Sequence, residues 1–246
     1  MDKLSLLKSK IKVDEQVLSN LFHDLELIHS LDTRIVELGV DGGAMIDIIY
    51  GLVPKDFDLR YSAKINDQYI VDCICDEISV KIKDVKDFKI LSYDKIDLNN
   101  INEHRSLENC ESLESSIDSI YSPNSCFNNI PTFTSNGKFL CSEISFEAIA
   151  NKIYMPNFLG YMSYYFKGFT HDQYYEVILE MVVRGVSYIV KRNLTPNDDF
   201  IRLLEQFHKL TKAINDERLE KIINMKFESR GEFENLITKY SKTYKI

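Results

Sequence analysis

The stretch from residue 42 to residue 61, GGAMIDIIYGLVPKDFDLRY, constrains the fold of this chain more than any other. It opens with two of the chain's nine glycines side by side, continues through a short apolar segment, and then reaches Asp-Phe-Asp. A Gly-Gly pair favours a tight turn, because glycine adopts backbone conformations that other residues avoid. The apolar residues that follow share one helical face and predict a helix over about 43–51, which Gly51 and Pro54 close.

The segment DFDLRY after this helix predicts a strand, in which alternate side chains share a face. Asp56 and Asp58 then point the same way while Phe57 faces the core. Two carboxylates about 4 Å apart repel each other by roughly 4 kcal/mol at an effective dielectric constant near 20. Such a pair is either solvated or binds a divalent cation, and its oxygens suit Mg²⁺ or Mn²⁺. Backbone N–H groups of Gly42 and Gly43, at a helix N-terminus, supply a matching phosphate site.

The same stretch resembles the head-domain signature of class II tRNA nucleotidyltransferases and bacterial poly(A) polymerases, in the DNA polymerase beta superfamily. That signature reads approximately GG-x-V-R-D-x-L-L-G-x-x-P-K-D-x-D-[LIV]. The matching residues are Gly42, Gly43, Asp47, Gly51, Pro54, Lys55, Asp56, Asp58 and Leu59. The resemblance implies an α+β fold: a nucleotidyltransferase head domain with a mixed β-sheet and flanking helices, followed by an all-helical C-terminal domain.

The resemblance also implies an activity, the metal-dependent transfer of a nucleotide from an NTP to a hydroxyl acceptor with release of pyrophosphate. The implied acceptor is an RNA 3′ end, of a tRNA or another RNA. In the family the two strand aspartates, here Asp56 and Asp58, bind two metal ions, Mg²⁺ or Mn²⁺. By spacing, the third carboxylate is Asp97, with Asp94 as the alternative, in a segment KDFKILSYDKIDL that predicts another strand. Lys55 would touch phosphate, or else is an exposed turn lysine.

Two weaker similarities to the same family follow, in the order in which its motifs occur along the chain. ESSIDSIY at 114–121 is similar to the family's D-F-T-I-N-A-[IL]-A, and EMVVRGVSYIVKRNLTP at 180–196 resembles its helical neck. Arg184 matches the neck arginine, which implies a nucleotide-binding role; the alternative is a solvated helix face.

Several positions depart from the family pattern. Ile46 replaces an arginine after the Gly-Gly turn, and Leu113 replaces another arginine before the 114–121 motif. The family's E-D-x-x-R element, which reads the incoming base, is absent near 177–181, and this argues against specific CCA addition. The alternative function is a degenerate, non-catalytic nucleotide-binding or protein-interaction module of the same fold, or nucleotidyl transfer to a small-molecule or protein acceptor.

The character of the sequence changes near residue 143. Before it, an amphipathic helix is predicted over 14–30, a strand at RIVELGV, and a hairpin at Asn136-Gly137. After it, helical periodicity dominates, from EAIANKIY to EFENLITKY. We therefore predict a head domain over 1–142, with its N-terminal helix, and a helical neck-like domain over 143–246.

Net charge, hydropathy and cysteine content limit the classes of protein to which this chain can belong. A net charge of −8 argues against broad non-specific binding of nucleic acid, which relies on many Lys and Arg contacts to phosphate. No run approaches the roughly 18 apolar residues that a membrane span needs, and no signal peptide is evident. Five cysteines without a C-x-x-C pair favour reduced thiols. We predict a soluble, cytoplasmic protein.

Overall fold

The computed structural model describes residues 3–30, 32–54, 58–65, 68–74, 107–108, 113, 131–156 and 170–244. Two compact units make up the chain: the first holds the described residues up to Phe146, and the second those from Glu147 onwards. The α+β class predicted from the sequence is confirmed.

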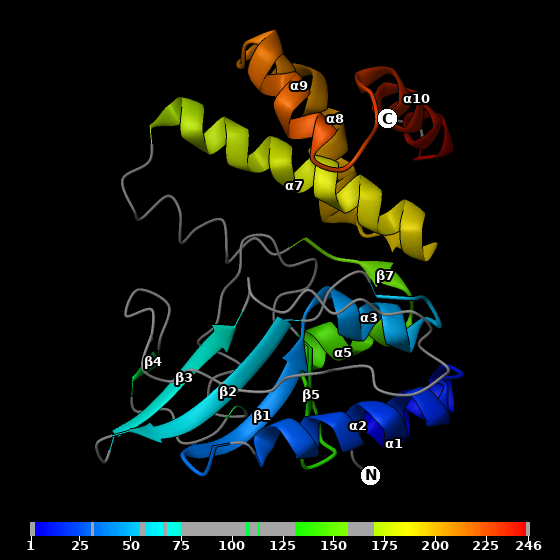
Figure 1. Ribbon diagram of the computed structural model, residues 1–246. Coiled ribbons are helices and arrows are strands. Elements are labelled where there is room, and N and C mark those ends of the chain that lie inside the picture. The colour runs from blue at the N-terminus through cyan, green and yellow to red at the C-terminus, as the bar shows by residue number, and fades with distance from the viewer. Residues whose placement is uncertain are drawn as a thin grey trace. The chain divides into compact units, whose positions relative to one another are not determined.

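The first unit is built on a six-stranded sheet (Figure 1). Its strands are β1 (Ile35–Asp41), β2 (Asp58–Ile65), β3 (Gln68–Ile74), β4 (Leu107–Glu108), β5 (Thr132–Thr134) and β6 (Phe139–Leu140). They lie in the order β4-β3-β2-β1-β5-β6.

Every pairing between the described strands of this sheet is antiparallel, so the predicted mixed sheet is wrong for this part of the chain. For two of the five pairings, β2 with β3 and β5 with β6, the physical reason is the length of the connection. Two residues separate β2 from β3 and four separate β5 from β6, and connections this short can only form hairpins. The hairpin predicted at Asn136-Gly137 is confirmed, and Gly137 takes a positive φ of 78° there.

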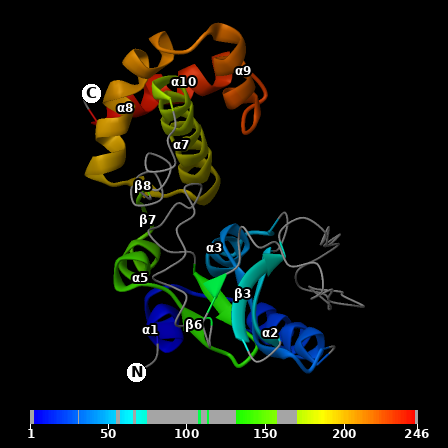
Figure 2. The same ribbon diagram turned by 90° about the vertical axis from the view of Figure 1, so that its left-hand side faces the viewer.

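Among the described helices, four belong wholly or partly to the first unit: α1 (Lys3–Lys10), α2 (Glu15–His29), α3 (Gly43–Ile49) and the start of α5 (Glu143–Ala150). The Asp14 side chain caps α2 by accepting hydrogen bonds from the N–H groups of Gln16 and Val17. The apolar face of α2 packs along the sheet (Figure 2), where Phe22 meets Phe133 of β5 edge to face at 5.7 Å. This contact fixes the core side of the sheet.

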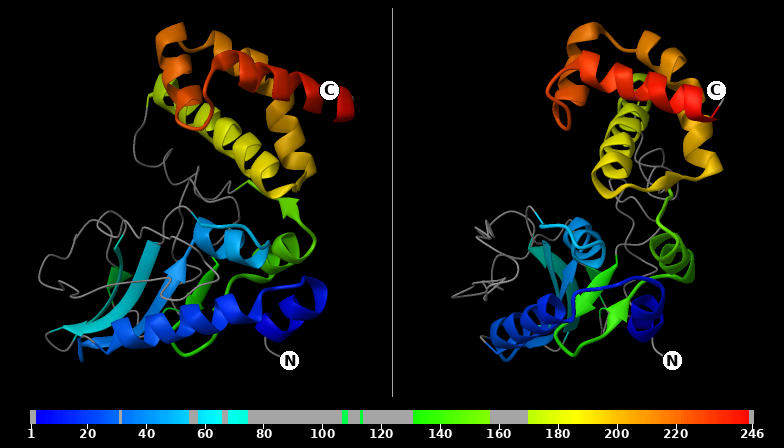
Figure 3. Two further views of the ribbon diagram at one scale, coloured as in Figure 1. Left: turned by 45° about the vertical axis from the view of Figure 1, so that its right-hand side comes forward. Right: turned by 90° about the vertical axis from the view of Figure 1, so that its right-hand side faces the viewer.

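The second unit contains α7 (His171–Arg192), α8 (Asp198–Lys212), α9 (Asp216–Asn224) and α10 (Arg230–Tyr244), with β7 (Ile153–Tyr154) paired in parallel to β8 (Thr195–Pro196). Helices α8, α9 and α10 gather around α7 (Figure 3). Thr170 and Gln173 form a capping box at the start of α7, and Asn193 ends the helix in the left-handed conformation. In the described ranges we find no helix with the length and apolar character required to cross a membrane.

Candidate functional site

The Gly-Gly turn predicted from the sequence lies at the end of β1. Gly42 has φ 72° and ψ −138°, a conformation open in practice only to glycine. Its N–H donates a hydrogen bond of 3.2 Å to the carbonyl of Pro131, which ties the turn to the start of β5. Helix α3 begins at Gly43 directly afterwards. Glycine permits this turn, and any other residue would be strained at position 42.

The first residue of β2 returns to the same end of the sheet. In the register of the antiparallel pair, Asp58 lies directly opposite Asp41, and Asp41 in turn lies opposite Thr132 of β5. The Gly42 turn and the first residue of β2 are therefore neighbours in space. We did not select Asp41 from the sequence, although a signal was present: it ends a predicted strand one residue before the turn.

Most other predicted residues of this site lie outside the described part of the chain. These are Lys55, Asp56 and Asp97, with its alternative Asp94, and Asp58 is described as a strand position only. Among the described residues, no group of three or more His, Cys, Asp or Glu is arranged to hold a metal ion.

A row of buried polar residues extends along β1, β2 and β5, away from the turn. It consists of Glu37, Arg60, Ser62, Thr132 and Thr134. The carboxylate of Glu37, only 6% exposed, accepts hydrogen bonds from the Leu113 N–H at 2.9 Å and the Asn136 side-chain amide at 3.1 Å. These two bonds satisfy a charge that would otherwise be costly to bury.

Leu113 immediately precedes the 114–121 motif, which lies outside the described residues. Its own position is fixed against β1, because a methyl group added at Gly39 would lie 3.1 Å from Leu113 Cδ1 and 2.5 Å from Thr132 Cγ2. The close approach needs glycine at position 39. It brings Leu113 onto the strand that leads to the Gly42 turn.

The two arginine positions that the family would supply are apolar and buried here. Ile46 on α3 is fully buried, and Leu113 is 1% exposed. Neither position can offer a cation to a phosphate. Asp47, which matches the signature, is buried on α3, and its carbonyl accepts the N–H of Leu52 at 2.8 Å to close the helix.

In the second unit, Arg184 is half-buried on α7. Its Nε is buried and has no hydrogen-bond partner among the described residues. Arg192, further along the same helix, is different, since its guanidinium lies 3.4 Å from the centre of the Tyr188 ring and is buried. We therefore assign Arg192 to packing and keep Arg184 as the candidate ligand of this helix.

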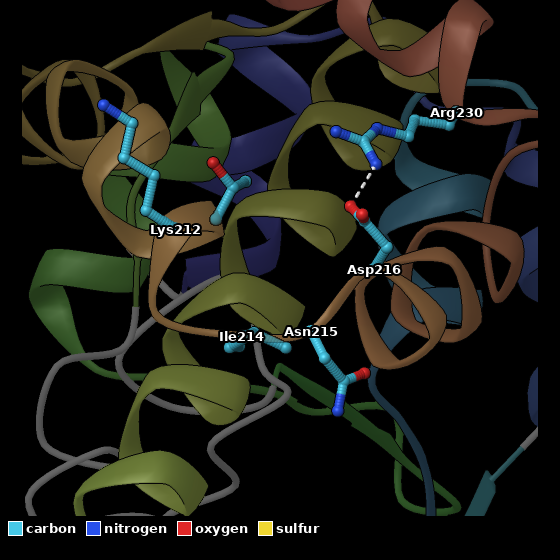
Figure 4. A pocket seen from close by; sticks show the side chains of 6 residues that line it. Lys212, Ile214, Asn215, Asp216 and Arg230 are labelled. Atoms are coloured by element: carbon cyan, nitrogen blue, oxygen red, sulfur yellow. Dashed lines mark hydrogen bonds and ion pairs between the residues drawn. The ribbon is translucent and has the colours of Figure 1, made fainter.

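A separate hollow of about 680 Å³ lies where α8, α9 and α10 meet (Figure 4). Its lining is Thr211, Lys212, Ile214, Asn215, Asp216 and Arg230. Arg230 pairs with Asp216 at 2.8 Å and with Glu234 at 2.7 Å. The bond to Glu234, followed by the one to Asp216, raises the pKa of Arg230. This cation is already paired within the chain, so we interpret the hollow as a junction between helices.

No protein-family model matches this chain, and no curated protein matches it significantly.

Proposed function

We propose that this protein is a metal-dependent nucleotidyltransferase that transfers a nucleotide from an NTP to a hydroxyl acceptor, an RNA 3′ end, and releases pyrophosphate. One observation carries the proposal: a glycine-only turn at Gly42 ends β1, and the last residue of β1 lies opposite Asp58. A phosphate-binding turn and a carboxylate strand at one end of a sheet are the two halves of a nucleotide site.

The phosphate half would consist of backbone N–H groups at Gly42 and Gly43, where the missing side chains allow close approach. Lys55 would add positive charge to the bound triphosphate. Arg184 lies in the second unit, and its unpartnered, buried Nε makes it a separate candidate for binding an anion, because a guanidinium without a partner gains most from one.

The metal half would consist of Asp56, Asp58 and Asp97 or Asp94. This donor set is oxygen only and fits Mg²⁺ or Mn²⁺ rather than a softer ion. When bound, the metal would polarise the phosphate oxygens and lower the pKa of the attacking hydroxyl. In the reaction the acceptor oxygen forms a bond to the α-phosphorus, and the bond from that phosphorus to the pyrophosphate oxygen breaks. The third carboxylate would accept the proton of the hydroxyl.

The test is transfer of α-labelled ATP, CTP, GTP and UTP, each alone with Mg²⁺ or Mn²⁺, onto total cellular RNA. Asp58→Asn should abolish the labelling, while Asp198→Asn, at an exposed carboxylate of α8, should keep it. Label that persists in Asp58→Asn, or no transfer to any hydroxyl, would refute the proposed reaction.

The second candidate is a non-catalytic nucleotide-binding module of the same fold, and buried Ile46 and Leu113 at two family arginine positions favour it. Metal-dependent NTP binding without transfer to RNA, to small molecules or to protein hydroxyls would support it. Transfer to a small molecule or to a protein hydroxyl would mean that the protein is a nucleotidyltransferase with an acceptor other than RNA. For either candidate we expect the protein to act in the cytoplasm.

A further inference from the structure

A groove of about 270 Å³ runs between α7 and α9 in the second unit. Its lining is Glu176, Glu180, Arg218, Lys221, Ile222 and Met225. The α7 side is acidic, and the α9 side carries two cations followed by two apolar residues. The two walls of the groove therefore have opposite charge.

One pair of these charges is already closed within the chain, since Arg218 Nη1 lies 2.7 Å from Glu176 Oε1. The next charged residues of the groove are Glu180, one turn further along α7, and Lys221, one turn further along α9. Neither forms an ion pair with any residue in the described ranges. The groove is thus lined by one unmatched anion and one unmatched cation.

The apolar part of this surface is also open. Met225 is 40% exposed at the end of α9. Flexible methionine side chains adapt well to a second apolar surface.

We infer that this groove is the contact surface between two copies of the chain, related by a twofold axis. A partner whose surface carries charge of one sign would be attracted by one of these two residues and repelled by the other. A second copy of the chain avoids this repulsion, because a twofold rotation brings Glu180 of each protomer against Lys221 of the other. The same attractive contact is then made twice. Met225 then packs against the partner surface. This inference is independent of the proposed nucleotidyl transfer.

The experiment is sedimentation equilibrium of the full chain over the micromolar range. Wild type should sediment as a concentration-dependent dimer. Glu180→Lys and Lys221→Glu each turn two attractive contacts into two repulsive ones and should raise the dimer dissociation constant about tenfold or more. An equimolar mixture of the two variants should regain dimers, because each variant then meets the opposite charge at both contacts.

Matched controls are Glu205→Lys and Lys209→Glu, which make the same charge changes at exposed positions of α8 away from the groove and should dimerise like wild type. Circular dichroism of all four variants checks that they fold. A monomeric wild type leaves the groove to another partner and overturns the inference. Dimers that resist both reversals, or a mixture that stays monomeric, overturn it as well.

Discussion

Glu37 and Leu113 are 76 positions apart in the chain and are joined by a hydrogen bond of 2.9 Å, donated by the Leu113 N–H to the Glu37 carboxylate. Both residues are buried. The bond attaches Leu113 to β1, the strand that ends at the Gly42 turn. Leu113 and the candidate phosphate turn thus share one strand as their support.

Replacing Glu37 should therefore destabilise the first unit. Glu37→Ala leaves the buried Leu113 N–H and the Asn136 amide without their acceptor, so we expect a loss of about 1–3 kcal/mol in the free energy of unfolding. Glu37→Gln keeps one acceptor oxygen and should lose less. Urea denaturation measures both. A Glu37→Ala variant as stable as wild type would mean that solvent replaces the carboxylate at no cost.

Substitution at Gly42 should affect both stability and nucleotide binding. Alanine is strained at φ 72° and ψ −138°, and we expect a cost of about 1–3 kcal/mol. The displaced turn should also weaken NTP binding about tenfold or more, since a hydrogen bond to a charged group contributes about 1.5–3 kcal/mol. Isothermal titration calorimetry with each NTP and Mg²⁺ measures the affinity.

Gly51→Ala is the matched control for Gly42. Gly51 also has a positive φ, 71°, but open space surrounds the position of an added Cβ. We expect a stability loss of about 1 kcal/mol with unchanged NTP affinity. Equal weakening of binding in both variants would show that the loss reflects general destabilisation and not the turn.

Local patterns predicted much of this fold. Apolar spacing gave a helix over 14–30 where α2 spans Glu15–His29, and a helix over about 43–51 where α3 spans Gly43–Ile49. The predicted helix at EAIANKIY ends early, at Ala150. Lys152 adopts φ 54°, and Ile153–Tyr154 pair with Thr195–Pro196, more than forty positions away. Apolar periodicity does not reveal a pairing partner that is distant in the chain.

In the candidate site, too, local features could be predicted from the sequence, whereas contacts between distant segments could not. The Gly42 turn followed from residue type alone, because only glycine tolerates such a conformation. The position of Asp41 opposite Asp58 depends on strand register, and the contact of Leu113 with Gly39 depends on packing between distant segments. Neither has a local signature, so both emerge only from the structure. The roles of Asp56, Asp97 and Lys55 stay predictions.

Gly185 allows α7 to approach its neighbours closely. A Cβ at this position would lie 2.5 Å from Phe200 Cε2 and 2.7 Å from Tyr154 Oη. Gly185→Ala should therefore lower stability by about 1–3 kcal/mol through overpacking, although alanine normally favours a helix. Thermal unfolding measures the change. In the background of Phe200→Leu, which makes room, the same substitution should cost clearly less; equal costs in both backgrounds would exclude overpacking against Phe200 as the cause.

The thiol of Cys141 gives a prediction about alkaline pH. Burial raises its pKa from an ordinary value of 9.0 to about 12. The folded state therefore holds this proton more tightly than the unfolded state. The resulting stabilisation is complete below about pH 9 and is lost as the pH rises toward about 12.

Cys141→Ala removes this titration, so the stability advantage of wild type over the variant should shrink as the pH rises through that window. The decrease should reach at most about 1.4 kcal/mol for each pH unit. Urea unfolding of both proteins under reducing conditions, at several values between about pH 8 and about pH 11, measures the difference. Lysine and tyrosine titrations are common to both proteins and cancel in it. A difference that does not change with pH would mean that the Cys141 thiol ionises as readily in the folded chain as in the unfolded one.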